Sequence, residues 1–243
     1  MQSAASPERV AEAAKAILDS EVAVEAEAPA APIDDLFPEE RRYATGWAPS
    51  RQREFAAARV AARRALARLG VEAGALVPHA DRSPRWPDGV VGSITHTRDL
   101  CLVAVARRGR LASVGIDVER VTAATTDIEE LVCTPSERRW LDAQPAAQRG
   151  ANVRLFFSAK EAFYKCQYPL TKTYLDFQDV ELAIGGDGMF AARIVGAAHV
   201  ALNRELASVQ GRWAWLDGLV FATAIALRSP LPSAGEGVRE AAA

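Results

Sequence analysis

Two acidic residues stand two positions apart at the end of an apolar segment, residues 115–119 (GIDVE). Residues two apart on a strand point to the same side, so Asp117 and Glu119 would project together while their apolar neighbours face the core. Adjacent carboxylates repel each other unless a cation lies between them, and hard oxygen ligands suit Mg²⁺ that holds a phosphate. A strand end whose acids simply face water is the alternative interpretation.

A third acid and two lysines occur in residues 157–165 (FSAKEAFYK), where Glu161 and Lys165 share one face of a predicted helix. Only four of the 29 basic residues are lysine, and three of these, Lys160, Lys165 and Lys172, fall within 13 residues. Arginine stays protonated in proteins, whereas lysine can exchange a proton. The lysine cluster therefore indicates proton chemistry; the alternative is a chance cluster in which Glu161 and Lys165 form a surface salt bridge.

Groups suited to phosphate precede these motifs. His96 ends an apolar strand among Ser and Thr hydroxyls, a setting that could bind phosphate oxygens or simply cap the strand. Earlier in the chain, six arginines occur in a predicted helix over residues 51–68, and some of them could reach a phosphate with bidentate geometry while most form a solvated face. A nucleic-acid groove lacks support because the formal net charge is −2 and no exposed aromatics are interleaved with the arginines.

The elements that must position these groups follow from hydrophobic periodicity and from capping signals. Helices are predicted at residues 1–20, 38–48, 50–69 and 151–168, with a short one after Thr134. Strands are predicted at residues 22–28, 90–95, 100–106, 111–118, 180–184, 189–194, 213–216 and 219–227. Ser50 is expected to cap the third helix, and Pro169 is expected to stop the helix before it.

The element order repeats, and residues 53–59 resemble residues 154–160 at an offset of 101, which aligns Arg59 with Lys160. We therefore expect a pseudo-duplicated α+β protein of two lobes, each a long helix packed on a small, mainly antiparallel sheet. The expected division is an N-terminal lobe over residues 1–114, a C-terminal lobe over residues 115–228 and a disordered tail over residues 229–243. A cleft between such lobes is a common ligand site.

Composition limits the class of protein. The 243 residues are 49% hydrophobic and 25% charged, which is typical of a globular chain and excludes one that is wholly disordered or membrane-embedded. No apolar run reaches the length of a membrane-spanning helix, and the N-terminus does not resemble a signal peptide. Three cysteines without a CxxC pair predict neither a disulfide framework nor a zinc site, so we expect a reduced, cytoplasmic protein.

Five segments, in this order along the chain, resemble the 4′-phosphopantetheinyl transferases, specifically the larger two-lobed group of Sfp and enterobactin-synthase type. They are residues 51–59, 86–97 (WPDGVVGSITHT), 115–119 (GIDVE), 157–165 (FSAKEAFYK) and 169–177 (PLTKTYLDF). The resemblance implies a pseudo-dimer of two α/β lobes with coenzyme A in the cleft. It implies transfer of the phosphopantetheine arm of coenzyme A to a serine of an apo acyl or peptidyl carrier protein, with release of 3′,5′-ADP.

Residue roles are carried over by matching position. The resemblance implies that Asp117, Glu119 and Glu161 hold Mg²⁺, or Mn²⁺ in its place, with Glu161 as general base and Lys165 as the group that stabilises or protonates the departing phosphate. The implied coenzyme A contacts are Arg51, Arg59, Thr95, His96, Asp117, Lys160, Lys165 and Leu175. The loop over residues 78–82 would lie along the adenine.

Two other classes of function remain to be weighed. A magnesium nuclease usually places a lysine two residues after the second acid, but position 121 is Val121. A non-catalytic module that binds carrier protein or nucleic acid has no need of the complete acid and lysine set. We expect a monomer that acts on coenzyme A and carrier proteins, without nucleic acid or membrane; a fatty-acid, polyketide or nonribosomal-peptide carrier fits equally well.

Overall fold

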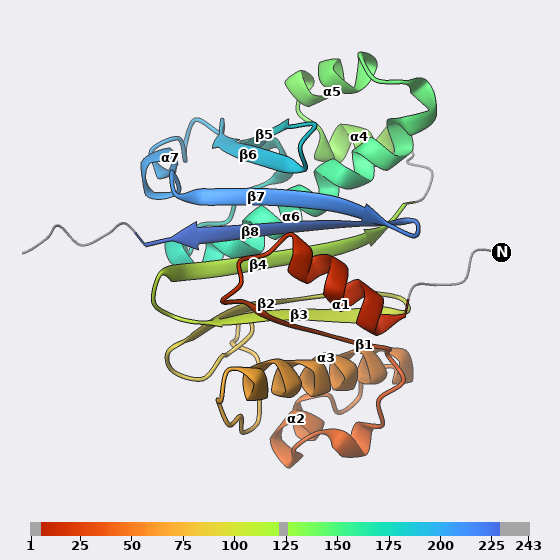
Figure 1. The fold of residues 1–243 in the computed structure, drawn as a ribbon, viewed down its shortest axis with the longest axis vertical. Helices are drawn as coiled ribbons and strands as arrows, with labels where there is room; N and C mark the ends of the chain where they lie inside the picture. Colours follow the sequence, from red (N-terminus) through yellow and green to blue (C-terminus); the bar gives the residue numbers. More distant parts are fainter. Residues whose placement is uncertain (1–5, 122–125, 229–243) are drawn as a thin grey trace, which may run out of the picture.

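The strands form two antiparallel sheets in the structure, a computed structural model that describes residues 6–121 and 126–228 (Figure 1). The first sheet has the order β1-β3-β2, with β1 at Ala23–Glu27, β2 at Val90–Thr97 and β3 at Leu100–Arg107. The second has the order β4-β8-β7-β6-β5, with β4 at Leu111–Arg120, β5 at Val180–Ile184, β6 at Met189–Ile194, β7 at Val209–Leu216 and β8 at Leu219–Leu227. The predicted tail at 229–243 lies outside the described residues.

One long helix packs on each sheet, as the sequence predicts. In the N-terminal lobe, α3 (Pro49–Arg68) lies against β1 and β3 and buries a face of small residues, among them Ala61, Ala62 and Ala65. In the C-terminal lobe, α6 (Arg149–Thr171) lies against β4 and β8. Shorter helices complete the described chain: α1 (Pro7–Ala16), α2 (Pro38–Tyr43), α4 (Thr126–Val132), α5 (Pro135–Asp142) and α7 (Leu202–Glu205).

The glycine of the GIDVE segment explains how closely α6 approaches β4. A Cβ atom built on Gly115 would fall 2.0 Å from the carbonyl oxygen of Ala162 and 2.7 Å from the backbone nitrogen of Cys166. Only a residue without a side chain permits this approach of helix to strand. The acids on β4 are thereby brought against the helix that carries Glu161 and Lys165.

Two local expectations are corrected, and two helices are added. Ser50 lies inside α3, which begins at Pro49, because proline suits the first helical position. Pro169 does not stop α6 but lies in its last turn, where the missing N–H removes a single intrahelical bond. The helix ends at Lys172, whose φ of 52° is left-handed and whose backbone N–H donates to the Tyr168 carbonyl. The helices α4 and α7 were not predicted.

The two lobes share one topology. The series β1, α2, α3, β2 and β3 recurs as β4, α5, α6, β7 and β8, and the strand order β1-β3-β2 matches β4-β8-β7. Strands β5 and β6 extend the second sheet only. The chain passes from one sheet to the other between Arg107 and Leu111, so the expected division at residues 114 and 115 falls inside β4.

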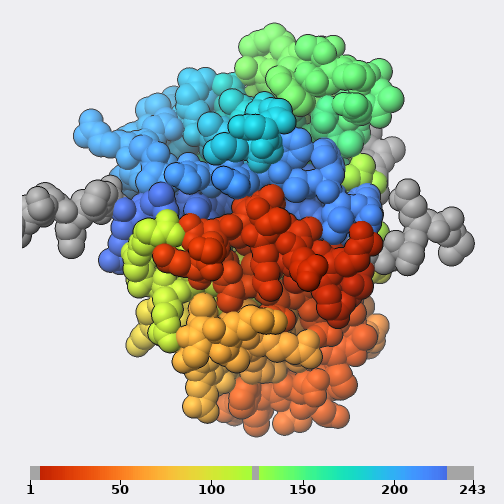
Figure 2. All heavy atoms as spheres, viewed as in Figure 1, coloured from red at the N-terminus to blue at the C-terminus, as the bar shows by residue number. Residues whose placement is uncertain are grey.

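The lobes meet along β2 and β4, where the Ile116 backbone N–H donates to Ser93 Oγ over 3.1 Å. Apolar side chains of α1, such as Val10 and Ala14, join a buried cluster that includes β1, β3, β4 and β8. Figure 2 shows α1 lying across the boundary between the two lobes. In the described part of the chain, every helix is too short or too polar to cross a membrane.

Candidate active site

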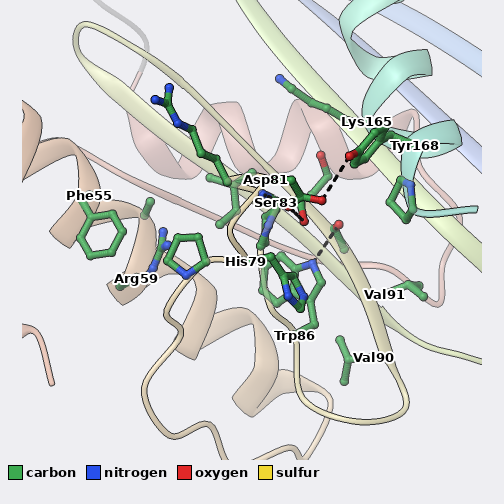
Figure 3. A pocket seen from close by; sticks show the side chains of 18 of the residues that line it. Phe55, Arg59, His79, Asp81, Ser83, Trp86, Val90, Val91, Lys165 and Tyr168 are labelled. Atoms are coloured by element: carbon green, nitrogen blue, oxygen red, sulfur yellow. Dashed lines mark hydrogen bonds between the residues drawn. The ribbon is translucent and has the colours of Figure 1, made fainter. Parts of the chain in front are cut away.

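A cavity of ≈1500 Å³ lies between the lobes. Its N-terminal wall comes from α3, β2 and the loop over residues 78–89, and its C-terminal wall comes from the last turns of α6 (Figure 3). The lining includes Arg51, Arg59 and His96 from one lobe and Lys165 and Tyr168 from the other. Both lobes are therefore needed to build the cavity.

Asp117 is the point at which three elements meet. It is buried on β4, and its Oδ1 accepts a hydrogen bond from Thr95 Oγ1 of β2 over 2.8 Å and one from Lys165 Nζ of α6 over 2.7 Å. Lys165 Nζ also lies 3.9 Å from Glu161 Oε2. Four residues singled out from the sequence, separated by up to 70 positions, are thus brought together beside the cavity.

Negative charge is in excess around Asp117. Its Oδ2 is buried and has no hydrogen-bond partner. Burial, followed by the charge of Asp117, raises the pKa of Glu119 to about 7, although Arg154 lies 3.9 Å away. Burial also raises the pKa of Glu161, against the opposing effect of Lys165. Within residues 6–121 and 126–228, no three Asp, Glu, His or Cys side chains are drawn together closely enough to hold a metal ion.

Each lobe contains the same buried hydrogen-bonded knot around a glutamate. Glu137 Oε2 accepts from Lys160 Nζ and from the backbone N–H of Thr134, and its Oε1 accepts from the Leu182 N–H. In the N-terminal lobe, Glu40 accepts in the same way from Arg63 and from the Phe37 and Leu76 N–H groups. Lys160 further donates to the Val132 carbonyl and Arg63 to the Asp35 carbonyl.

This pattern aligns α3 with α6 at an offset of 97, since Glu40 matches Glu137 and Arg63 matches Lys160. The offset of 101 expected from the sequence is therefore wrong by one helical turn. The two alignments of α3 with α6 differ by four residues, which is about one helical turn, so similar residues still lie on the same face of the helix. This explains the sequence similarity at an offset of 101. In the corrected register, Arg64 and Arg68 of α3 occupy the positions of Glu161 and Lys165.

The strands align too, and they reveal a counterpart of the acidic pair. Residues 22–27 (VAVEAE) match residues 114–119 (VGIDVE), because Glu25 pairs with the fourth residue of β3 as Asp117 pairs with the fourth residue of β8. Arg64 forms an ion pair with Glu27, and Arg68 forms one with Glu25. The sequence analysis missed this site, and the signal that could have found it was the repeated alternation of acids in the two strands.

The residue types around Asp117 suit a divalent cation, although the described carboxylates are not drawn together closely enough to form a metal site in the structure. The N-terminal counterpart balances two carboxylates with two arginines, whereas the C-terminal site has three carboxylates beside Lys165 and Arg154 and leaves one buried oxygen unpartnered. Carboxylate oxygens are the ligands that Mg²⁺ prefers. The donor set and the unbalanced charge both favour binding of a cation here.

The N-terminal wall of the cavity carries positive charge. Arg59 is buried over the ring of Phe55 at 3.9 Å, and its Nε donates to the Leu76 carbonyl. Burial lowers the pKa of Arg59 to about 10, so it remains a cation at neutral pH. Arg51 Nη1 lies 3.1 Å from His96 Nε2, and burial, followed by the charge of Arg51, lowers the pKa of His96. These groups can receive anionic oxygens.

The loop over residues 78–82 lines the same cavity, as expected, and it contacts α6 across the opening. Tyr168 Oη donates to Asp81 Oδ2 over 3.2 Å, and Asp81 also accepts from the Ser83 N–H and hydroxyl (Figure 3). These bonds lower the pKa of Asp81 to about 2. The sequence analysis did not anticipate this contact, because nothing in the separate segments relates them.

Two expected coenzyme A contacts lie elsewhere. Lys160 does not line the large cavity; its ammonium is buried and donates to Glu137, Val132 and Phe177, each over 2.8 Å. Leu175 belongs to the apolar core of the C-terminal lobe. Both border a smaller recess of ≈140 Å³ beside Glu161. The structure thus separates them from Arg51, Arg59 and His96.

Comparison with known proteins identifies the class. Residues 39–106 match the 4′-phosphopantetheinyl transferase N-terminal domain, and residues 113–216 match the 4′-phosphopantetheinyl transferase superfamily. The chain belongs to this family and is a transferase, as the sequence predicts.

Two relatives that resemble the chain over most of its length agree with that class. The chain is 44% identical to 4′-phosphopantetheinyl transferase Svp of Streptomyces mobaraensis, over 88% of each chain. It is 36% identical to 4′-phosphopantetheinyl transferase PptT of Mycobacterium tuberculosis, over 79% of this chain and 86% of that one. Among solved structures, a holo-ACP-synthase from Plasmodium yoelii matches with a TM-score of 0.39 and 20% identity, covering 49% of this chain and 96% of that one.

Proposed function

We propose that this enzyme transfers the 4′-phosphopantetheine arm of coenzyme A to a serine hydroxyl of an apo acyl or peptidyl carrier protein, with Mg²⁺ and with release of 3′,5′-ADP. The observation that carries the proposal is Asp117, a buried carboxylate with one unpartnered oxygen, held by Lys165 beside Glu161 at a large cavity with a cationic wall. Carboxylates next to phosphate-binding cations are the groups that phosphoryl-type transfer requires.

Coenzyme A is the substrate for which the cavity is suited. Its three phosphate groups need cations, and Arg51 and Arg59 provide them on one wall while Lys165 provides another at the opposite wall. His96, whose lowered pKa favours the neutral imidazole, adds a hydrogen-bonding group beside Arg51. We assign Arg51 and Arg59 to the 3′-phosphate, and Thr95 and His96 to the remaining phosphates. The loop over residues 78–82 would border the adenine.

Asp117, Glu119 and Glu161 are the residues that would hold Mg²⁺, because their oxygens suit the ion and their charges exceed those of the neighbouring cations. The bound ion supplies charge neutralisation for the pyrophosphate. Mn²⁺ has the same ligand preference and would take the same place. Lys165, which donates to Asp117 Oδ1, also lines the cavity and would face the phosphates of the substrate.

The bond changes assign the remaining roles. The serine oxygen forms a bond to the β-phosphorus of coenzyme A, the bond from that phosphorus to the bridging oxygen breaks, and 3′,5′-ADP leaves with the electron pair. Glu161 accepts the serine proton, directly or through a water molecule, since a carboxylate beside the incoming hydroxyl can act as a general base. Lys165 stabilises the oxygen that leaves, or gives it a proton.

One chain supplies both walls of the cavity, which supports action as a monomer. The three cysteines, Cys101, Cys133 and Cys166, are buried and free, which suits a reducing compartment such as the cytoplasm. Carriers of fatty-acid, polyketide and nonribosomal-peptide synthesis all present a serine, and each is a candidate acceptor.

Intact-mass spectrometry of apo carrier proteins tests the proposal. A panel of carriers is incubated with the enzyme and coenzyme A, first with Mg²⁺ and then with EDTA. A gain of one phosphopantetheine that requires the metal is expected. Absence of any gain, together with failure to bind coenzyme A, would contradict the proposed substrate, and equal transfer in EDTA would contradict the proposed metal.

A further inference from the structure

The knot around Glu137 in the C-terminal lobe is buried on all sides. The side chains of Lys160 and Glu137 are 2% and 1% exposed, and their nitrogen and oxygen are 2.8 Å apart. Every hydrogen of the ammonium has an acceptor: Glu137, the Val132 carbonyl and the Phe177 carbonyl. A lysine whose three donors are all satisfied by protein is not free to bind substrate.

The knot around Glu137 lies next to Glu161, the proposed general base. Lys160 precedes Glu161 in α6, and its bond to the Phe177 carbonyl fixes the segment that follows the helix. That segment and α6 border the recess of ≈140 Å³, whose lining includes Glu161, Tyr164, Tyr174 and Phe177. Tyr164 lines both this recess and the large cavity, so the two are adjacent.

Glu137 connects the segment to the rest of the lobe. It receives Lys160 from α6, the Thr134 N–H at the start of α5 and the Leu182 N–H of β5. Removal of either partner would leave a buried group unpaired, so the segment over residues 174–177 would relax away from α6. The wall opposite Glu161 would then lose its fixed position.

We propose that Lys160 and Glu137 are positioning residues for the transfer reaction: they fix the wall over residues 174–177 opposite Glu161, and this wall sets where the serine of the carrier protein meets that carboxylate. The inference rests on the proposed function, since it assigns the recess beside Glu161 to the incoming carrier. It gives Lys160 a role through protein contacts in place of the coenzyme A contact expected from the sequence.

The equivalent knot of the N-terminal lobe provides a matched control. Arg63 donates to Glu40 and to the Asp35 carbonyl, as Lys160 donates to Glu137 and to the Val132 carbonyl, and Glu40 is fully buried. The residue after Arg63 is Arg64, which pairs with Glu27 on β1 away from Glu161. Loss of this pair should cost stability without changing the position of Glu161 or of the segment over residues 174–177. The two knots therefore separate a structural effect from a positioning effect within one molecule.

The test compares Lys160→Met with Arg63→Met, each assayed for kcat, the KM for carrier protein, the KM for coenzyme A and the Tm. Both variants should lower the Tm. Only Lys160→Met should lower kcat and raise the KM for carrier protein, with a combined loss in kcat/KM of roughly 10- to 100-fold, the size expected for a misplaced reacting group. The KM for coenzyme A should stay unchanged in Lys160→Met. Arg63→Met is the control for kcat and for the KM for carrier protein only, because Glu40 also holds Leu76, whose carbonyl accepts from Arg59.

A second pair of variants guards against misfolding. Glu137→Gln keeps the size of the side chain and one carbonyl oxygen for the Leu182 N–H, and Glu40→Gln is its match. Glu137→Gln should show the same selective loss of kcat and of affinity for carrier protein, on a smaller scale. Lys160→Arg keeps the positive charge and has the side chain found at position 63, so its kcat should be higher than that of Lys160→Met.

Two outcomes would overturn the inference. Equal kinetic behaviour of the two lobes' variants would make the knot around Glu137 merely structural. A raised KM for coenzyme A in Lys160→Met, with kcat and the KM for carrier protein unchanged, would place Lys160 in the coenzyme A site. Failure of the proposed function is distinguished beforehand, because the unaltered enzyme would then modify no carrier.

Discussion

The two lobes carry the same strand and helix at corresponding positions but treat their acidic residues in opposite ways. On β1, Glu25 and Glu27 are each matched by an arginine of α3. On β4, Asp117 and Glu119 face a helix that adds a third acid, Glu161, to the lysine. In the first lobe, arginines of the protein balance the charge of the acids. In the second lobe, negative charge remains unbalanced, and a bound cation can balance it.

The position of the two sites explains why only one of them is suited to reaction. β4 adjoins β2 of the other lobe, which supplies Thr95 and the cavity beside it. β1 lies at the outer edge of its sheet, and among residues 6–121 and 126–228 no strand adjoins it on the side away from β3. The same local motif is thus completed by a second lobe in one case and by ion pairs in the other.

The largest effect should come from removing the charge of Asp117. Asp117→Asn should lower transfer by roughly three orders of magnitude, because the metal and the lysine both lose their partner. Glu25→Gln, the corresponding change in the N-terminal lobe, should leave kcat unchanged. Carrier mass measured against time checks both variants, and a comparable loss in Glu25→Gln would break the distinction between the lobes.

Arg59→Ala should have a smaller effect, confined to coenzyme A. Loss of a charged hydrogen-bond donor to phosphate should raise the KM for coenzyme A about tenfold. Arg68→Ala is the control on the same helix, because Arg68 pairs with Glu25 and should not alter the KM. Steady-state kinetics at varied coenzyme A would detect the difference; an unchanged KM in Arg59→Ala would remove that residue from the site.

Metal binding should be visible as stability. A ligand at 100 times its Kd stabilises the folded state by about 2.7 kcal/mol, which for a chain of this size corresponds to a Tm rise of roughly 5–10 °C. The unaltered enzyme should show such a rise with Mg²⁺, while Asp117→Asn should not. Differential scanning calorimetry with MgCl₂ or EDTA measures it, and an equal rise in both proteins would contradict the metal assignment.

The N-terminal counterpart sharpens that prediction. The double variant Arg64→Glu/Arg68→Lys gives α3 the acid and lysine found on α6, next to Glu25 and Glu27. Without metal, its Tm should be lower than that of the unaltered enzyme. On addition of Mg²⁺, its Tm should rise by more than the Tm of the unaltered enzyme rises. If added Mg²⁺ stabilises the double variant no more than the unaltered enzyme, the altered site on β1 and α3 does not bind the cation, and the proposed equivalence with the site on β4 and α6 is wrong.

The smallest effect concerns the pKa of His96. The charge of Arg51 and burial both disfavour the protonated imidazole, so Arg51→Gln should raise the pKa of His96 while burial still holds it below its ordinary value. Titration of the imidazole resonances by NMR measures the change, with His79 and His199 as references in the same protein. A fall in the His96 pKa would show that Arg51 does not face the imidazole.

Sequence patterns predicted the long helices and most strands, because alternation and helical spacing are local properties. The grouping of Asp117 with Glu161 and Lys165 is a long-range contact, and it was expected only from the resemblance to the family. Sequence patterns also predicted the capping box of Thr134 and Glu137. The same Glu137 carboxylate also receives Lys160, and that contact depends on how α5 and α6 pack. Such long-range contacts, like that of Tyr168 with Asp81, cannot be predicted from a local sequence pattern.

The placement of α1 has a consequence for the order in which the protein is made. Its apolar side packs with β4 and β8, and Thr223 Oγ1 of β8 donates to the Ile17 carbonyl, 206 positions away. During synthesis, α1 cannot pack on β8 until β8 has left the ribosome. Contacts of such separation slow folding, so the apolar side of α1 stays exposed until β8 has been translated.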